Sequence, residues 1–179
     1  MAVLLRTAGW RHQHIEWIHP LALLGQSPFL IASQGKRILG ALACPMDPPG
    51  VSWLRLFVVA SEQSADAVWD ALWSEAAMQA AESGARVGAA LVVESWLVPL
   101  LTHAGFTLTH AVVFLEWQGN QPLPMYDGSM TPRVMAEDDL PAVHQLDQLA
   151  FAPLWRHSLS SLAAALRQAQ SATVLEMDG

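Results

Sequence analysis

Short apolar runs separated by turn residues dominate the first third of the chain, and they predict strands. The runs at 28–32 and 38–43 flank a glycine-containing turn, which is typical of a β-hairpin. Residues 51–60 are rich in the β-branched and aromatic side chains that strands favour, so a three-stranded meander is expected. Ahead of it, the apolar triplet at 3–5 predicts a short strand, and scattered apolar residues up to position 27 predict a poorly regular helix.

The spacing of apolar residues changes after position 60, and a helix is predicted from 61 to 81. Apolar side chains recur there at intervals of three and four residues, which places them on one helical face. They are Val68, Trp69, Leu72, Trp73, Ala76, Ala77 and Ala80. Ser61 or Ser64 can cap the start of this helix, and Gly84 follows its end, where glycine is favoured.

Three further elements are predicted before position 118. The continuous apolar run at 87–93 is typical of a strand that is buried on both faces. Residues 95–103 predict a short helix closed by Gly105, and residues 107–117 predict another strand. The predicted order is therefore strand, weak helix, three strands, helix, strand, helix and strand.

Residues 119–130 have the glycine, asparagine and proline content of a linker, and the pattern restarts beyond them. Residues 131–179 predict a strand, two amphipathic helices preceded by the acidic pair Asp138 and Asp139, and a final strand. Such a half unit cannot bury its sheet face alone, and it leaves strand edges open. We therefore expect residues 131–179 to dock on the first unit, or on a second copy of the chain to form a homodimer.

Composition excludes several classes of protein. With 53% hydrophobic and 14% charged residues, the chain has the material for a buried core, which excludes disorder as its main state. The net charge of −7 and the single lysine, Lys36, disfavour nucleic acids and anionic membranes as partners. No apolar run reaches the roughly 18 residues of a membrane span, and the start does not resemble a signal peptide. A soluble, cytoplasmic protein is expected, and the lone Cys44 agrees with a reducing compartment.

Two segments carry a resemblance to a known family. Ala104, Gly105 and Phe106 precede the last predicted strand of the first unit, and the sequence RVMAEDDLPAVHQLD at 133–147 combines a strand, an acidic cap and a helix start. Together with the order of elements, they resemble the GNAT family of acetyl-CoA-dependent N-acetyltransferases. The resemblance implies an α/β fold, α+β in detail, with a mostly antiparallel mixed sheet flanked by helices. It also implies a tandem protein, in which one unit is complete in outline and the other is partial. The unit that is complete in outline spans residues 1–118 and has a degenerate cofactor loop. The partial unit spans residues 131–179.

The resemblance implies a place for acetyl-CoA. The pantetheine arm would bond to the backbone of Val58, Val59 and Ala60, and the pyrophosphate would lie at the start of the next helix, near Ser64. Ser64 stands where the family has a basic residue or glutamine, and Trp69 stands where it has a small residue. Three nearby carboxylates would repel an anion: Glu62, Asp66 and Asp70. The cofactor loop is therefore interpreted as degenerate.

The family's catalytic groups have no counterpart at the matching positions. Leu101 replaces the tyrosine that acts as general acid, and Glu94 replaces the asparagine that opens the same helix. Arg55 is the only charged residue of 51–60, where the family has a carboxylate, and the only tyrosine, Tyr126, lies in the predicted linker. No catalytic residue is assigned. The resemblance implies a degenerate or incomplete acetyltransferase relative which, if active, acetylates an amine that the sequence does not identify. The alternative is a non-catalytic dimerisation or regulatory module on the same scaffold.

The histidines and the cysteine have simple interpretations. His12, His14 and His19 carry imidazoles that can bind metal ions, but we interpret them as ordinary surface histidines and assign no metal site. Cys44 could be a nucleophile beside a suitable base, but an isolated cysteine in apolar surroundings is more often a small core residue.

The tryptophans are interpreted in the same way. Trp69 and Trp73 lie one turn apart on an alanine-rich face, so they are expected in the core rather than in the wall of a ligand site. Trp155 lies in a segment that resembles the substrate side of the second unit, where it would line an acceptor pocket or only pack against its neighbours.

Overall fold

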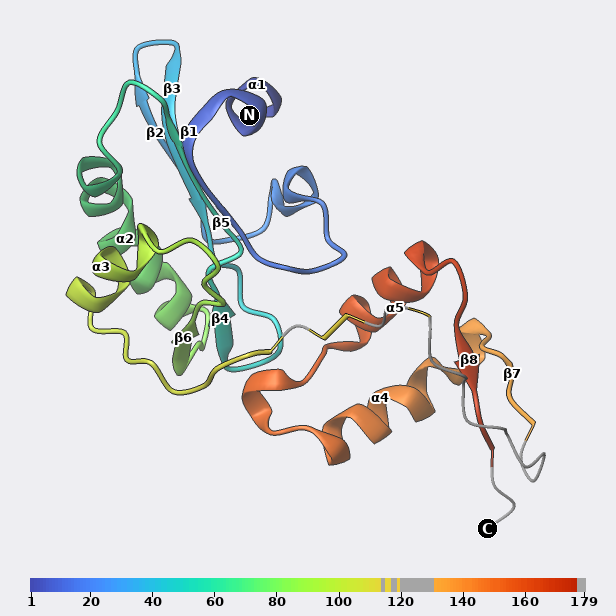
Figure 1. Cartoon of the computed structure of the whole chain (residues 1–179). Coiled ribbons are helices and arrows are strands. Elements are labelled where there is room, and N and C mark those ends of the chain that lie inside the picture. Colours follow the sequence, from blue (N-terminus) through green and yellow to red (C-terminus); the bar gives the residue numbers. More distant parts are fainter. Residues whose placement is uncertain (114, 117–118, 120–130, 177–179) are drawn as a thin grey trace.

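The computed structural model describes residues 1–113, 115–116, 119 and 131–176. The first unit is a mixed α/β layer structure, and the second is a small helical unit that lies against one end of the first (Figure 1). The predicted α+β class is therefore observed: an antiparallel sheet with helices packed on it. Of the predicted linker, only Gly119 is among the described residues, and the Asp178–Gly179 pair lies outside them.

Four strands form the main sheet, in the order β1-β5-β3-β2, and all their pairings are antiparallel. The expected hairpin is confirmed as β2 (Phe29–Gln34) and β3 (Arg37–Ala43). The third strand of the expected meander is β5 (Leu56–Ala60), which pairs with β3. On its other side β5 pairs with β1 (Ala8–Gln13).

The first thirteen residues differ from the prediction. Residues 3–5 belong to a helix, α1 (Ala2–Thr7), and β1 follows directly where an irregular helix was expected. The six-residue α1 is too short to be stable alone, so its conformation depends on tertiary contacts. Leu4 supplies one, because it packs in the core cluster on one face of the sheet. Of the weak helix that was predicted up to position 27, residues 14–27 form only the 3₁₀ turn η1 (Pro20–Leu23).

The predicted strand at 51–60 is two strands in two different sheets. β4 (Val51–Trp53) pairs in parallel with β6 (Val87–Ala89), whereas β5 belongs to the main sheet. The change of partner occurs at two residues: the backbone N–H of Leu54 donates to Ala89 O at 2.7 Å, and that of Arg55 donates to Ala43 O at 2.9 Å. Arg55 therefore lies where the chain passes from the small parallel pair into the large sheet.

Helix α2 (Ala65–Glu82) confirms the helix predicted from apolar spacing. The Ser64 hydroxyl caps it by accepting a hydrogen bond from the N–H of Ala67 at 3.4 Å. Its apolar face packs on the main sheet together with α3 (Leu97–His103), while α1 and η1 cover the opposite face (Figure 1). Alternate residues of β5 point to the two faces: Phe57 and Val59 to the α2 side, and Leu56 and Val58 to the α1 side.

Of the two strands predicted after α2, the first is shorter and more exposed than expected, and the second is absent from the described residues. Of residues 87–93, only Val87–Ala89 form a strand, and Val87 is 48% exposed, so this strand is not buried on both faces. Residues 107–113, 115 and 116 form no strand, and Leu108 is 93% exposed. Within the described residues β6 pairs only with β4, so the apolar residues around it lack the second strand that would bury them. The short helix before them, α3, is confirmed, and Gly105 closes it with a φ of 88°.

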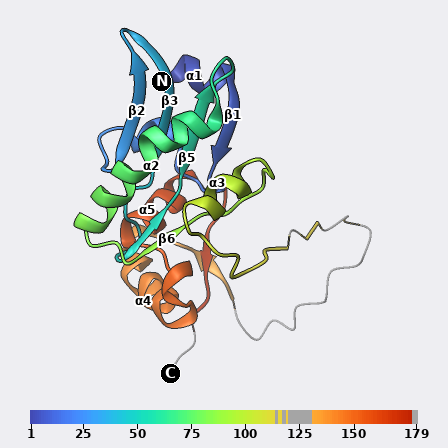
Figure 2. The same ribbon diagram turned by 90° about the vertical axis from the view of Figure 1, so that its left-hand side faces the viewer.

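The second unit follows the predicted order of strand, helix, helix and strand. Its elements are β7 (Arg133–Val134), η2 (Glu137–Asp139), α4 (Leu140–Ala150), η3 (Pro153–Trp155), α5 (Leu159–Gln168) and β8 (Thr173–Val174). β7 and β8 form an antiparallel pair. Asp139 precedes α4 as expected, but its side chain makes no capping hydrogen bond to that helix; its carboxylate instead accepts from the N–H of Ala136 at 2.8 Å and closes the η2 turn. Figure 2 shows α4 and α5 at the end of the molecule where β4 and β6 lie.

No helix within the described part of the chain has both the length and the apolar character needed to cross a membrane.

Candidate functional site

The second unit contacts the first through side chains that converge near β4. The indole N–H of Trp17 donates to the carbonyl oxygen of Ser161 at 3.1 Å, and the Ser161 hydroxyl donates to Oδ2 of Asp47 at 2.6 Å. The rings of Trp53 and Trp155 lie 5.6 Å apart across the same junction. Of the two expected ways of burying residues 131–179, the structure therefore contains docking on the first unit.

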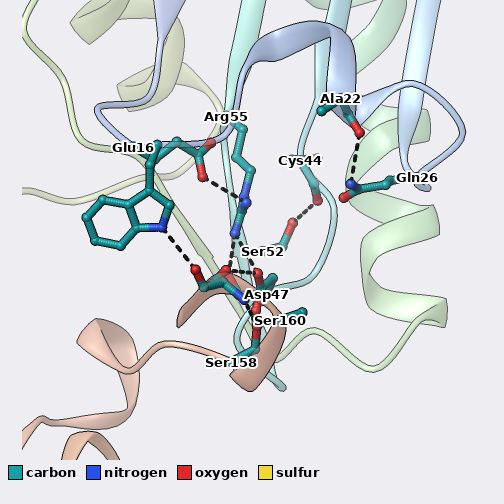
Figure 3. A network of polar contacts seen from close by, with 11 residues as sticks. Glu16, Ala22, Gln26, Cys44, Asp47, Ser52, Arg55, Ser158 and Ser160 are labelled. Atoms are coloured by element: carbon teal, nitrogen blue, oxygen red, sulfur yellow. Dashed lines mark hydrogen bonds and ion pairs between the residues drawn. The ribbon is translucent and has the colours of Figure 1, made fainter. Parts of the chain in front are cut away.

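A buried arginine lies at the centre of this junction (Figure 3). Arg55 is 5% exposed, and its Nη1 donates to Oε2 of Glu16 at 2.9 Å. Its Nη2 donates to Asp47 twice, to the carbonyl oxygen at 3.0 Å and to Oδ2 at 3.2 Å. A buried charge is tolerated only when it is paired and hydrogen-bonded, so these two carboxylates explain how Arg55 can interrupt an apolar segment. Its Nε has no hydrogen-bond partner among the described residues.

Burial shifts the titration of two groups beside Arg55. Desolvation raises the pKa of Glu16 to about 7; the Arg55 charge opposes this shift and Asp47 adds to it. Desolvation lowers the pKa of His14 to about 4, and the positive charges of Arg55 and, to a smaller extent, His12 act in the same direction. His14 is therefore neutral at pH 7, and its buried Nδ1 has no partner within the described part of the chain.

A hydrogen-bonded pair of an aspartate and a histidine orients the segment between α4 and α5. Asp147, which is 7% exposed, accepts from the backbone N–H of His157 at 2.8 Å, and its Oδ1 lies 2.9 Å from His157 Nδ1. Burial acts to raise the pKa of Asp147, but these hydrogen bonds outweigh it and hold the pKa below its usual value. The His157 ring stacks on Trp17 with centroids 5.6 Å apart. The pair thus holds this segment against the first unit.

A cavity of about 210 Å³ lies between the two units and is lined by residues of both. Its wall combines polar side chains of the first unit with aromatic and polar side chains of the second. Those that matter chemically are His14, Glu16, Asp47, Trp53, Arg55 and Trp155. A larger and more apolar cavity of about 530 Å³ lies beside β6 and α3, and Trp53 and Trp155 line both cavities.

The residues predicted to hold acetyl-CoA lie elsewhere, at the opposite end of β5. Val58 and Val59 are fully buried, and each is paired with β1 on one side and with β3 on the other. Ala60 pairs with Ala8 of β1, and Ser64 caps α2 a few residues further on. The four residues are therefore close in the chain and in the fold, and none of them lines the cavity between the units.

The tryptophans and the cysteine behave as core residues. Trp69 is 2% exposed, packs edge-on against Phe57 at 5.2 Å and stacks on Trp73 at 4.9 Å, so the core interpretation is confirmed for Trp69. Trp73 is partly buried against the core cluster and also lines the larger cavity. Cys44 is buried, and desolvation raises the pKa of its thiol to about 11, against a smaller opposing effect of Ser52. A thiol with this pKa stays protonated at neutral pH and is a poor nucleophile.

The interpretation of the histidines as surface residues is wrong for His12. Its side chain is fully buried; Nε2 lies 3.1 Å from Leu54 O, and Nδ1 lies 3.3 Å from Oε2 of Glu94. Both partners are acceptors, so both contacts are hydrogen bonds only when the ring carries two protons. The error arose because residues 8–13 form a strand, which turns His12 inward. In the described ranges no group of three histidine, cysteine or acidic side chains is placed to hold a metal ion.

Glu16, Asp47 and Ser161 received no role in the sequence analysis, yet they build the junction. One signal was available: Arg55 is the only charge in an apolar strand, and such a residue requires carboxylate partners. The identity of those partners depends on contacts across 39 and 8 positions, which no local pattern encodes.

Comparison with known protein families, characterised proteins and solved structures gives no match to this chain.

Proposed function

We propose that this chain is a non-catalytic relative of the GNAT acetyltransferases, in which the first unit serves as a scaffold that holds the partial second unit. The observation that carries this proposal is the pairing of β5 on both sides. In an antiparallel strand with two neighbours, successive N–H and C=O groups point alternately to each neighbour. The register pairs Val58 with Arg11 and Ala41, and Val59 with Trp10 and Gly40. These residues have no backbone groups left for a pantetheine arm.

The way β1 reaches β5 supports the same proposal. The strand has a bulge at Gly9, and a Cβ atom there would lie 2.6 Å from the Cα of Ser61. Real Cβ atoms do not approach backbone that closely, so glycine permits β1 to lie against the end of β5. β1 thus occupies one edge of β5, so a pantetheine arm could not bond to the backbone on that side.

The start of α2 lacks the properties of a pyrophosphate site. The N–H of Ala67 already bonds to the Ser64 hydroxyl, and Asp66 places a carboxylate in the first turn. A helix N-terminus attracts anions through its free N–H groups and its dipole; here a side chain already occupies one of these N–H groups, and the Asp66 carboxylate lies at the positive end of the dipole. Trp69, at the position where the family has a small residue, is buried in the core.

One observation favours a second candidate, an acyltransferase that retains acetyl-CoA binding. β4 and β6 are parallel, and the chain leaves this pair at Leu54 to enter β5, so β5 and the residues after β6 diverge. Diverging strands would give a pantetheine arm an entrance, and the reaction would be acetyl transfer to an amine. The indole of Trp96 lies in this region, with ring centroids 6.0 Å from Phe57 and 5.4 Å from Trp10. This packing favours the scaffold proposal over the second candidate.

Thermal unfolding of the full chain in the presence of millimolar acetyl-CoA distinguishes the two candidates. A ligand at about 100 times its dissociation constant stabilises a protein by about 2.7 kcal/mol, which corresponds to several degrees in Tm for a chain of this size. The scaffold proposal predicts no shift beyond that given by coenzyme A or adenosine, and no release of free thiol with any amine. A saturable shift specific to acetyl-CoA would overturn it. The buried Cys44 thiol keeps the background of the thiol assay low.

A further inference from the structure

A fully buried histidine joins three separate parts of the first unit. His12 belongs to β1; its Nε2 lies 3.1 Å from the carbonyl oxygen of Leu54, and its Nδ1 lies 3.3 Å from Oε2 of Glu94. Leu54 lies where the chain passes from β4 to β5, and Glu94 precedes α3. One ring therefore contacts the passage between the two sheets and the segment that leads into α3.

Both atoms that face the His12 ring are hydrogen-bond acceptors. A neutral imidazole has one N–H donor and one lone pair, so it bonds to one of the two oxygens and turns its lone pair toward the other. The imidazolium has two N–H groups, bonds to both oxygens, and is compensated by the carboxylate. The number of protons on the ring therefore decides whether Leu54 and Glu94 are held at the same time.

The position of Glu94 affects the start of α3. Its carbonyl oxygen accepts from the N–H of Leu97 at 3.2 Å, and Leu97 is fully buried. α3 has seven residues and no side-chain cap at its start, so its stability depends on tertiary contacts. The helix contributes Leu101 and Thr102 to the wall of the larger cavity. A bond to the Glu94 side chain thus steadies one wall of that cavity at its beginning.

The other charged groups around His12 must be known before a pH effect is assigned to it. His14 is near enough for the charge of His12 to act on it; desolvation above all, and then Arg55 and His12, lower its pKa to about 4, so it stays neutral at higher pH. Arg55 keeps its charge, and Arg11 is directed to the carbonyl oxygen of Leu5. Glu16 changes charge, because burial raises its pKa to about 7. The acidic residues of α2 are exposed: Asp66, Asp70, Glu75 and Glu82.

We propose that His12 is a pH-dependent tie, which as the imidazolium holds Leu54 and Glu94 together and on losing the Nδ1 proton releases the Glu94 carboxylate. The Nε2–H group keeps its bond to Leu54. The Glu94 side chain is 36% exposed, so it can turn into water once the ring no longer donates to it. Rising pH therefore loosens the start of α3, and falling pH tightens it as long as Glu94 is ionised. This device does not depend on the function proposed above.

Glu94→Gln is the variant that separates the tie from simple packing. Glutamine has the same length and offers both a donor and an acceptor, so it bonds to the neutral ring as well as to the imidazolium. It also removes the carboxylate that favours the imidazolium. Long-range ¹H–¹⁵N NMR spectra of the histidine rings, recorded from pH 5 to 9, report the protons on each nitrogen. We expect His12 to lose its second proton at a pH lower by about one unit or more in the variant.

Amide hydrogen exchange at Leu97 and Val98 measures the consequence for α3. After correction for the direct effect of pH on exchange, both amides of the wild type should exchange about tenfold faster once His12 has lost its proton. In Glu94→Gln their corrected rates should not follow the His12 titration. Glu16 titrates in the same range, so the comparison is repeated with Glu16→Gln in both proteins, where the difference should persist.

Glu82→Gln is the matched control, because it removes one negative charge at an exposed position at the end of α2. It should behave as the wild type does in both measurements. The proposal would be overturned by a His12 ring that stays neutral from pH 5 to 9, by equal titration of His12 in the wild type and Glu94→Gln, or by corrected exchange at Leu97 and Val98 that ignores the protonation of His12.

Discussion

The Ser161 hydroxyl donates a hydrogen bond of 2.6 Å to Oδ2 of Asp47, a residue 114 positions earlier in the chain. The same carboxylate oxygen accepts from Nη2 of Arg55 at 3.2 Å. One oxygen atom therefore joins the buried arginine of the first unit to helix α5 of the second. The position of residues 131–176 therefore depends on a bond from Ser161 to a cluster of charged residues in the first unit.

Removing this hydroxyl should loosen the docked second unit. Ser161→Ala leaves Arg55 paired with Asp47 but removes the bond across the junction, and hydrogen bonds to charged groups contribute about 1.5 to 3 kcal/mol. We expect faster proteolysis within 131–176 and a lower urea midpoint. Ser160→Ala is the matched control, because Ser160 is exposed and its hydroxyl contacts only Ser158 among the described residues. Equal effects of the two substitutions would contradict the assigned role of Ser161.

Removing the arginine itself should cost far more. Arg55→Met leaves Glu16 and Asp47 facing each other without a cation, and breaking a buried ion pair in this way typically costs about 3 to 5 kcal/mol. The loss should be partly recovered in the double variant Glu16→Gln/Arg55→Met, which has one uncompensated carboxylate fewer. Equilibrium unfolding in urea measures both.

The control for the Arg55→Met variant is Arg37→Met. Arg37 pairs with Glu62, and both side chains are well exposed, at 63% and 40%. Exposed pairs contribute about 1 kcal/mol or less, so a small effect is expected. A loss at Arg55 as small as that at Arg37 would show that the cluster is not needed for stability.

Stability should depend on pH through two opposing groups. The pKa of Glu16 is raised from 4.5 to about 7 by folding, so the folded state keeps a proton that the unfolded chain has lost, and stability falls as pH rises across this range. The pKa of His14 is lowered from 6.5 to about 4, so the unfolded chain holds the extra proton and stability rises between those values. The two effects oppose each other up to pH 6.5, and only the Glu16 effect remains above it.

Glu16→Gln separates these effects. The variant should become more stable as pH rises from about 4 to 6.5, because the His14 effect is then unopposed, and it should lose the decline expected between 6.5 and 7. The lowered pKa of Asp139, about 2 owing to its hydrogen bond from Arg133, acts only below this window. Urea midpoints measured across the range provide the test, and identical pH profiles for variant and wild type would exclude the role given to Glu16.

The closeness of β1 to the end of β5 can be tested at one atom. Gly9→Ala places a Cβ 2.6 Å from the Cα of Ser61, so β1 must shift and stability should fall, by about 1 to 3 kcal/mol as for other overpacked sites. Gly88→Ala is the control, because the added Cβ would meet only ordinary contact with Phe106 at 3.6 Å. If Gly9→Ala were as harmless as Gly88→Ala, β1 would not lie where the structure has it.

The elements that could be predicted from sequence are those that depend on their own residues. Helix α2 has eighteen residues with apolar side chains at helical spacing and a serine cap, and the β2–β3 hairpin has a glycine turn between two apolar runs. The second unit was also predictable in outline, because both of its helices have amphipathic spacing and an acidic pair precedes the first of them, α4. In each case the local signal and the final structure agree, so little tertiary information was needed.

The errors lie where the partner of a segment decides its structure. Residues 51–60 look like one continuous strand in the sequence. They divide into β4 and β5 because β6 pairs with the first part, whereas β1 and β3 pair with the second. Residues 2–7 form a helix because the Leu4 side chain packs in the core cluster on one face of the sheet. The candidate site could not be predicted for the same reason: the fold brings Arg55 into contact with Glu16 and Asp47, and the spacing of these residues in the sequence does not indicate it.

Amide hydrogen exchange at Val58 and Val59, measured with and without millimolar acetyl-CoA, tests the central claim most directly. Neighbouring residues of β5 send their N–H groups to opposite strands, so these two amides together report on both edges. The account predicts that both exchange slowly in the free protein and that acetyl-CoA changes neither rate. Fast exchange at one of them in the free chain, with slow exchange once acetyl-CoA is added, would mean that one edge is open and receives the cofactor, which contradicts the account.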